Sequence, residues 1–166
     1  SQDWNEAWTR SVKPLRIGRL VVRPSWEPVL LGPQDIEIVL DPKQAFGTGH
    51  HATTRMLLEW LQEGIRGGEQ VLDVGTGSAI LAMAAVRLGA ASAIGVEIDS
   101  VAVDCAKEYV VQNGLNEQID IIGGTLADLP QERRQTTDLV LANLDRQTVL
   151  DFAGDLVCSA LRGASI

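Results

Sequence analysis

Short apolar segments recur along this chain, and each has the length of a buried strand. They cover residues 71–74, 91–96, 119–122 and 139–142. Segments that are apolar along most of their length are typical of parallel strands covered on both faces of a sheet. Helical patterns follow the first, second and fourth segments: one at 79–88, one that starts after Asp99 or Ser100 and ends at Asn113–Gly114, and one at 146–161. This alternation predicts an α/β fold with a doubly wound, mostly parallel sheet.

The ends of the predicted helices carry recognisable signals. Gly89 can end the first helix, Asp99 or Ser100 can cap the start of the second, and Asn113–Gly114 can close it. After the last helix only residues 162–166 remain, and they look like the turn into a further strand. We therefore expect the C-terminal strands of such a sheet to be missing.

The first part of the chain predicts further elements. Residues 1–12 can form a short helix with Trp4 and Trp8 on one face. Alternation over 16–23 predicts one half-exposed strand that Pro24 stops, and 36–40 predicts a second. A helix over about 53–62 is expected to bury four side chains, namely Met56, Leu57, Trp60 and Leu61.

A glycine turn, Gly75–Thr76–Gly77, joins the first buried strand to a helix. Such a turn brings backbone N–H groups close to a ligand. A phosphate-binding loop would need a lysine before the helix, and a dinucleotide fingerprint would need glycine at Ile80. The observed order, an acid followed by Gly-x-Gly-x-Ala, resembles the first motif of S-adenosylmethionine-dependent methyltransferases. A plain tight turn without a ligand is the alternative.

Composition narrows the classes of protein. At 166 residues, 45% of them apolar, the chain can form one domain with a full core. No apolar run approaches the ~20 residues of a membrane span, so we expect a soluble cytoplasmic protein. Cys105 and Cys158 lack disulfide or metal spacing. A net charge of −8 without a Lys/Arg cluster argues against nucleic-acid binding and suits a basic protein partner, although a solvated acidic surface also explains it.

A second glycine-rich stretch, AFGTGHHATT, occupies residues 45–54. Adjacent His50 and His51 point in different directions and have no partners at ligand spacing, so we expect no metal site. Gly47 and Gly49 give the backbone freedom, and Phe46 provides an aromatic face. A loop that closes over a bound ligand explains this composition better.

Four segments together resemble the catalytic domain of the PrmA family, which methylates ribosomal protein L11. They are LDPKQAFGTGHHATT, VLDVGTGSAILAMAAVRLGA, GVEIDS and LVLANL, within about residues 4–160. The chain departs from the family pattern at Ala79, where glycine is usual, at Glu97, where aspartate is usual, and at Ala52, where many members have proline. The resemblance implies a Rossmann-like class I methyltransferase fold of seven strands, with a separate recognition domain before residue 1.

On this basis we divide the chain into an N-terminal helix and strand extension, residues 1–44, and an S-adenosylmethionine-binding methyltransferase domain, residues 45–166. The expected cofactor contacts are Phe46, Gly47, Thr48, Thr54, Asp73, Gly75, Gly77, Glu97, Thr125, Leu126 and Asn143. Glu97 ends the second strand of the unit, where a carboxylate can accept hydrogen bonds from ribose hydroxyls. Asp99 is expected to be a helix cap rather than a ligand contact.

Asn143 ends the fourth strand, beside the point where strand order reverses, so we expect it at the reacting group. Capping of the following helix is the alternative, and the two roles are compatible. His51 is the only candidate for a general base. The expected function is S-adenosylmethionine-dependent methylation of amino groups of a basic ribosomal protein of the L11 type. Alternatives are another methyl acceptor or a non-catalytic module that binds the cofactor; Ile80 disfavours a nicotinamide dehydrogenase.

Overall fold

The computed structural model describes residues 12–41 and 52–144. Its larger sheet contains β4 (Gln70–Val74), β5 (Ser92–Glu97), β6 (Ile119–Gly123) and β7 (Leu139–Ala142). These strands lie in the order β6-β5-β4-β7, and every neighbouring pair is parallel. The predicted doubly wound parallel sheet is confirmed, and the four strands match the apolar segments of the sequence. Predictions for Trp4, Trp8, residues 45–51 and the helix at 146–161 lie outside the described residues.

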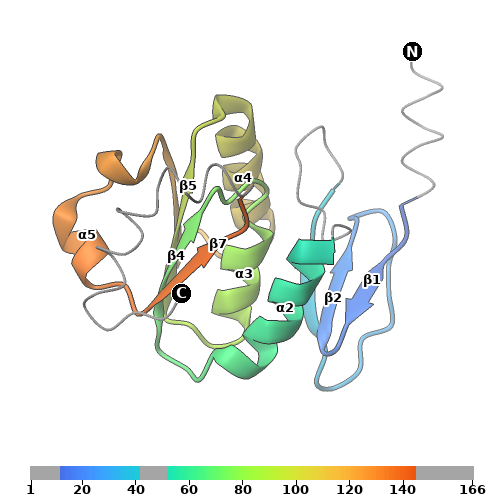
Figure 1. Ribbon diagram of the computed structural model, residues 1–166. Coiled ribbons are helices and arrows are strands. Elements are labelled where there is room, and N and C mark those ends of the chain that lie inside the picture. Colours follow the sequence, from blue (N-terminus) through green and yellow to red (C-terminus); the bar gives the residue numbers. More distant parts are fainter. Residues whose placement is uncertain (1–11, 42–51, 145–166) are drawn as a thin grey trace, which may run out of the picture.

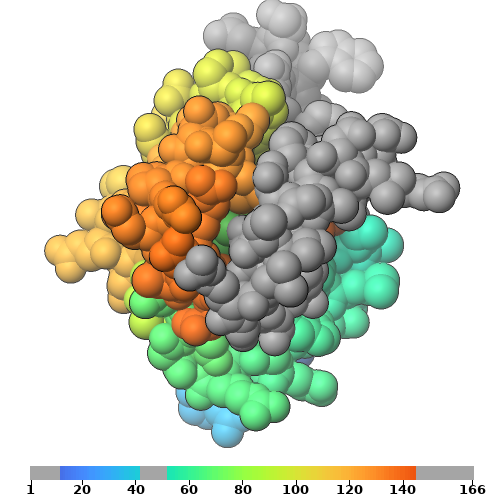
Figure 2. Space-filling view, turned by 60° about the vertical axis from the view of Figure 1, so that its left-hand side comes forward, coloured from blue at the N-terminus to red at the C-terminus, as the bar shows by residue number. Residues whose placement is uncertain are grey.

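Helices cover both faces of this sheet. Helices α3 (Ile80–Arg87) and α4 (Ser100–Gln112) lie on one face, and α5 (Gln131–Gln135) lies on the other (Figure 1). The chain changes face after β6 because strand order reverses there, from β6 at one edge to β7 beside β4. Figure 2 shows α5, in orange, and α2 (Ala52–Gly64), in cyan, on opposite flanks of the molecule. This arrangement puts the carboxyl ends of β4 and β7 next to one another at the reversal point.

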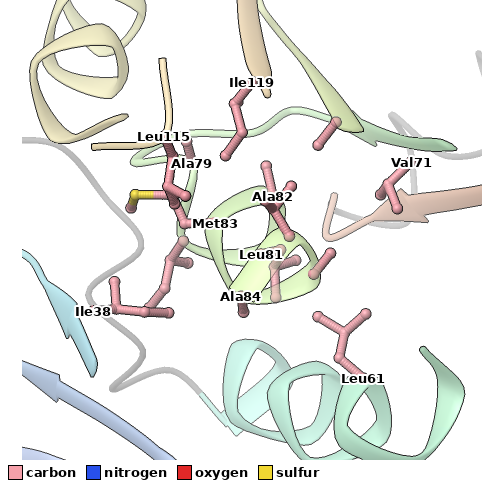
Figure 3. Packing of buried hydrophobic residues seen from close by; sticks show 14 of the residues in the cluster. Ile38, Leu61, Val71, Ala79, Leu81, Ala82, Met83, Ala84, Leu115 and Ile119 are labelled. Atoms are coloured by element: carbon pink, nitrogen blue, oxygen red, sulfur yellow. The ribbon is translucent and has the colours of Figure 1, made fainter. Parts of the chain in front are cut away.

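Helix α3 forms the centre of the core. Every residue from Ile80 to Val86 is buried, because the sheet covers one side of the helix while α2 and β3 (Ile36–Val39) cover others. Its alanines let these neighbours approach closely, and Met83 and Leu81 fill the space between them (Figure 3). The start of this helix is therefore fixed in place, and with it the glycine turn that precedes it.

The N-terminal strands form a separate small sheet. Strand β1 (Leu15–Ile17) pairs antiparallel with β2 (Leu20–Arg23), and β2 pairs parallel with β3. The prediction of one strand over 16–23 was wrong, because the chain turns at Gly18, which has a φ of 56°. The side chain of Gln62 in α2 fixes this turn by accepting a hydrogen bond from Arg19 N–H and donating one to the carbonyl of Ile17.

The small sheet shares its core with the helices of the larger one. Ile38 belongs to the same buried cluster as Leu61 and Met83 (Figure 3). Leu20 of β2 belongs to this cluster too. A polar link adds to this contact: the amide of Asn113 pairs with both the N–H and the carbonyl of Val39, each at 2.8 Å. The described part of residues 1–44 is thus packed as one body with the helices of the proposed methyltransferase domain.

Helix α2 buries a different face from the one predicted. Its buried residues are Thr54, Leu58 and Leu61. Met56 is 67% exposed and Trp60 is 45% exposed, so their predicted burial was wrong. The predicted burial of Leu61 is confirmed. The sequence pattern allowed either face, and the small sheet and α3 together select the face that carries Leu58.

The predicted caps of α4 are confirmed. The carboxylate of Asp99 accepts a hydrogen bond from Val101 N–H at 2.9 Å, and Asn113 ends the helix before Gly114, which has a φ of 67°. Within the described ranges, no helix has the length and apolar character needed to cross a bilayer.

Candidate functional site

The glycine turn lies at the carboxyl end of β4 and is tied to β5. The N–H groups of Gly75 and Thr76 both donate to the carbonyl of Val96, at 2.8 and 3.1 Å. Gly75 and Gly77 have φ values of 68° and 55°, which a side chain would strain. Ala79 adopts a φ of 62° without being glycine. Three left-handed residues in five thus let the chain leave the strand and enter α3 within one tight bend.

Asp73 supports this turn from below. The residue is buried at 1% exposure, and its Oδ2 accepts a hydrogen bond from the hydroxyl of Thr76 at 2.6 Å. Burial raises the pKa of Asp73 to about 7; the Thr76 hydrogen bond and the Ala82 N–H oppose this shift, while the negative charge of Glu97 adds to it. The residue titrates near neutrality, so its charge at the start of α3 depends on pH in the physiological range.

Glu97 joins the glycine turn to the start of α4. Its Oε2 accepts a hydrogen bond from Gly77 N–H at 3.0 Å, and its Oε1 accepts from the N–H groups of Ile98 and Asp99 at 2.9 and 3.1 Å. A carboxylate offers about four lone-pair positions on its two oxygens. Among the residues that the structure describes, backbone donors occupy three of these positions, which leaves one on Oε2 for a ligand.

A cavity of about 170 Å³ opens above these residues. Its walls are largely apolar and come from the ends of β4 and β5 and from the segments that follow β6 and β7. The lining residues are Val74, Gly75, Val96, Glu97, Ile98, Gly124, Thr125, Leu126 and Leu144. An apolar pocket with one carboxylate at its rim suits a flat heterocycle joined to a hydroxylated group.

The wall after β6 is held by a capping box. Thr125 N–H and the Thr125 hydroxyl both donate to Asp128 Oδ2, at 2.8 and 3.0 Å, and Thr125 Oγ1 accepts from Ala127 N–H at 3.3 Å. The hydrogen bonds from Thr125 hold the pKa of Asp128 below its usual value. Leu126 follows at 1% exposure and contributes its side chain to the smaller buried cluster behind the cavity. This short segment is therefore a rigid wall.

Asn143 and Leu144 leave the end of β7 in different directions. Asn143 Nδ2 donates a hydrogen bond to Thr54 Oγ1, in the first turn of α2, at 2.9 Å. Leu144 lines the cavity and packs against Gly75 so closely that a Cβ there would clash with it. Only glycine can occupy position 75 while Leu144 stays where it is. The end of β7 thus borders the cavity on one side and α2 on the other.

The structure brings together most of the described candidates. One cavity is lined by Gly75, Glu97, Thr125 and Leu126. Gly77 donates a hydrogen bond to Glu97 and so lies next to this cavity without lining it. Asp73 lies beneath the turn without lining the cavity, and Thr54 contacts Asn143. Phe46, Gly47, Thr48 and His51 lie outside the described residues. Each of these assignments to the cofactor stays a prediction.

The predicted contacts omit five residues that line the cavity: Val74, Val96 and Gly124, and the two apolar walls Ile98 and Leu144. Ile98 is 76% exposed although it lines the cavity. Ile98 directly follows Glu97, the last residue of β5, and Leu144 directly follows Asn143, the first residue after β7. No motif of residue type and spacing marks either position, because each becomes a wall of the cavity only when distant strands end side by side.

Comparison with known proteins identifies the family. The family model described as ribosomal protein L11 methyltransferase (PrmA) matches residues 1–165. The chain belongs to this family. The resemblance inferred from the four sequence segments is therefore confirmed.

Members of the PrmA family are similar in sequence to this chain along most of its length. The ribosomal protein L11 methyltransferase of Symbiobacterium thermophilum is 43% identical over 156 residues, which cover 93% of this chain and 50% of the relative. That of Geobacter sulfurreducens is 45% identical over 166 residues, covering 99% of this chain and 53% of the relative. The chain spans about half the length of the curated relatives it matches.

A solved structure of a PrmA-type protein also matches. The crystal structure of ribosomal protein L11 methylase from Lactobacillus delbrueckii subsp. bulgaricus has a TM-score of 0.79 and 30% identity, and covers 92% of this chain and 77% of that one. A more distant match is protein arginine methyltransferase 10 of Arabidopsis thaliana, with a TM-score of 0.55 and 26% identity, covering 67% of this chain and 33% of that one. The class I methyltransferase fold predicted from the sequence is confirmed.

Proposed function

We propose that this chain carries the cofactor site of an S-adenosylmethionine-dependent N-methyltransferase that modifies amino groups of ribosomal protein L11. The names of the PrmA relatives support the substrate and the reaction. The observation that carries the proposal is the cavity at the carboxyl ends of β4 and β5, with Glu97 at its rim and Asn143 beside it.

The residues present fit the cofactor. The apolar walls formed by Ile98 and Leu126 suit the adenine ring, and the open position on Glu97 Oε2 suits one ribose hydroxyl. The sequence alone predicts that Glu97 accepts hydrogen bonds from the ribose hydroxyls. Its three backbone donors favour one strong contact instead. Gly75 and Gly77 let the chain approach the rest of the cofactor without a Cβ in the way.

When bound, the cofactor supplies an activated methyl group on a sulfonium. The chain then has to place a neutral amine in line with that methyl at about 3–3.5 Å. A lysine amine has a pKa of ~10.4, so a proton must leave before transfer, and a closed, dry site favours the neutral form. We propose that the carbonyl oxygen of Asn143 accepts a hydrogen bond from the acceptor nitrogen and so directs its lone pair toward the methyl.

Several finer assignments remain part of this proposal. The net charge of −8 suits a basic ribosomal protein as partner, and a cytoplasmic location follows from such a substrate. We also retain the proposed boundary between an N-terminal extension, residues 1–44, and the methyltransferase domain, residues 45–166. No direct contact with nucleic acid is expected, and His51 stays the candidate base.

The proposal is tested in two steps. Isothermal titration calorimetry measures binding of S-adenosylmethionine to this chain, and mass spectrometry measures methylation of purified ribosomal protein L11 by the natural polypeptide that carries these residues. We expect binding and a mass gain of whole methyl groups on L11. Binding without any methyl transfer would favour the alternative, a non-catalytic module that binds the cofactor. Absence of binding would contradict both.

A further inference from the structure

We propose that Asp73 enables the site to distinguish the cationic cofactor from its neutral product, through a proton that the side chain releases when the cofactor binds. The inference rests on the proposed function, since it concerns the affinity of the same site for S-adenosylmethionine. Asp73 lies beneath the glycine turn and does not line the cavity. Its carboxyl group can therefore act on a ligand through its charge, without the direct contact that the sequence predicts.

The carboxyl group of Asp73 is buried and only partly compensated. The residue is 1% exposed and lies inside the sheet, paired with Gly95 of β5 and Leu141 of β7. Its Oδ2 accepts a hydrogen bond from the Thr76 hydroxyl at 2.6 Å. Its Oδ1 makes no hydrogen bond within the described part of the chain, although the Ala82 N–H favours the charged form. A buried carboxylate with so few donors takes up a proton more readily than one in water.

The charged groups around Asp73 add to this tendency. Burial is the largest cause that raises the pKa of Asp73 to about 7, and the negative charge of Glu97, at the end of β5, raises it further. The glycine turn, the first turn of α3 and β7 contain no titratable side chain. The charged side chains that α3 and α2 do carry are Arg87 in the last turn of α3, and Arg55, Glu59 and Glu63 on the exposed face of α2. Both histidines of the chain lie outside the described residues. Without a ligand, Asp73 therefore exchanges its proton near neutral pH.

The positive charge of the cofactor would lie across the glycine turn from Asp73. The sulfonium sulfur is bonded to the carbon that is attached to the ribose ring, and the ribose is proposed at Glu97. Glu97 in turn accepts a hydrogen bond from Gly77 N–H at 3.0 Å. Thr76, between the two glycines, contacts Asp73, while Gly75 lines the cavity. A single turn of backbone thus separates the proposed place of the sulfonium from the buried carboxyl group.

A positive charge at this place favours the ionised form of Asp73. Because the carboxyl group is buried, solvent screens the attraction only weakly. Binding of the cofactor should therefore lower the pKa of Asp73, and the proton goes to solvent. Methyl transfer leaves the electron pair of the broken S–C bond on sulfur, so the product is a neutral thioether. Asp73 then takes up a proton from solvent, and the product is held by one attraction fewer.

This difference sets how the affinity for each ligand depends on pH. A ligand whose binding expels a proton gains affinity as the pH rises. The contribution of Asp73 should tighten cofactor binding by about four-fold between pH 6 and pH 7.5, and should change product binding by less than about 1.5-fold. The two ligands share the same nucleoside and amino-acid parts and differ at the sulfur. The preference for cofactor over product should therefore grow as the pH rises.

Isothermal titration calorimetry on this chain tests the inference. Titrations at pH 7 in buffers of different ionisation enthalpy count the protons released. S-adenosylmethionine should release about 0.4 proton more from the unchanged protein than from Asp73→Asn, and S-adenosylhomocysteine under about 0.1 proton more. A proton that comes from the ligand itself is the same for both proteins and cancels. Asp104→Asn, which neutralises an exposed carboxylate on α4, is the matched control and should release as many protons as the unchanged protein.

Two results would overturn the inference. Equal proton release by the unchanged protein and Asp73→Asn would show that cofactor binding does not change the protonation of Asp73. Equal release for cofactor and product would show that Asp73 does not respond to the sulfonium. In either case binding itself would still support the proposed cofactor site. Absence of binding by both ligands would refute the site and this inference together.

A second variant keeps the test decisive if Asp73→Asn does not fold. Thr76→Val removes, at nearly constant volume, the hydroxyl that favours the charged form of Asp73. The pH range over which cofactor affinity changes should then move upward by about half a pH unit or more. An unchanged pH range in Thr76→Val would show that a group other than Asp73 releases the proton.

Discussion

Glu97 and Gly77 are joined by a hydrogen bond of 3.0 Å that links the carboxyl end of β5 to the glycine turn after β4. The same carboxylate accepts from the N–H groups that open α4. One side chain thus connects the two segments that border the proposed ribose position. Cofactor affinity should depend on Glu97 both through the ligand contact and through the shape of the turn.

Glu97→Ala should weaken binding of S-adenosylmethionine by about ten-fold or more. A charge-assisted hydrogen bond contributes roughly 1.5–3 kcal/mol, and loss of the Gly77 contact adds to the effect. Isothermal titration calorimetry on this chain measures the change. Asp104→Ala, which removes an exposed carboxylate from α4, provides the control and should leave the affinity unchanged. Equal affinities for the two variants would remove Glu97 from the site.

Asp73→Asn should alter how stability depends on pH. The folded pKa of about 7 lies above the usual value of 3.8, so the folded state holds this proton more tightly than the unfolded state. The contribution of this proton to the free energy of unfolding is fully present below about pH 4. It is lost as the pH rises to about 7, and the loss is on the order of a few kcal/mol. Asparagine keeps the shape of the side chain and cannot ionise.

Urea denaturation of both proteins at pH 5 and pH 8, followed by circular dichroism, measures this effect. The quantity to compare is the free energy of unfolding of Asp73→Asn minus that of the unchanged protein. This difference should be larger at pH 8 than at pH 5, because only the unchanged protein buries a charge at pH 8. Other titrating groups are common to both proteins and cancel in the difference. A difference that does not change with pH would show that Asp73 keeps an ordinary pKa.

Ala79→Gly should cost much less stability than Ala84→Gly, although both alanines are fully buried in or beside α3. Each substitution loses a buried methyl group, ~0.8 kcal/mol, and adds the flexibility of glycine, roughly 0.5–1 kcal/mol. Of the two alanines, only Ala79 has a left-handed φ, at 62°. Glycine tolerates this conformation, so Ala79→Gly also removes a strain of about 1–2 kcal/mol from the folded state. Thermal and urea denaturation compare the two variants. Equal losses would mean that Ala79 carries no backbone strain.

Local signals in the sequence were enough to predict the larger sheet. The apolar segments at 71–74 and 139–142 became β4 and β7, and Asp99 caps α4 as its position before the helix suggested. The turn at Gly18 was missed because one glycine inside an alternating segment fits a continuous strand as well as a hairpin. Nothing local distinguishes them, and Gln62, distant in the sequence, stabilises the hairpin.

The cavity was only partly predictable for a related reason. Gly75 and Glu97 belong to motifs that are recognised by residue type and spacing. Ile98 and Leu144 belong to no such motif. They line the cavity because strands from distant parts of the chain end side by side. Likewise, Leu58 rather than Met56 is buried because the small sheet covers one face of α2. Long-range packing decides such positions, and a local pattern does not contain it.

Asn113→Ala should loosen the connection between the two sheets. The Asn113 side chain pairs with both backbone groups of Val39 and also donates to the carbonyl of Tyr109, each at 2.8 Å. Alanine leaves the Val39 groups without these partners at a half-buried site, which should lower the free energy of unfolding by about 2 kcal/mol. Hydrogen exchange at the Val39 amide should quicken more than at amides of β4. Gln112→Ala, which removes an exposed contact to Asp41 at 3.1 Å, is the control and should cost under about 0.5 kcal/mol. If the two variants lose equal stability and Val39 stays protected, the shared hydrophobic core alone holds the small sheet in place.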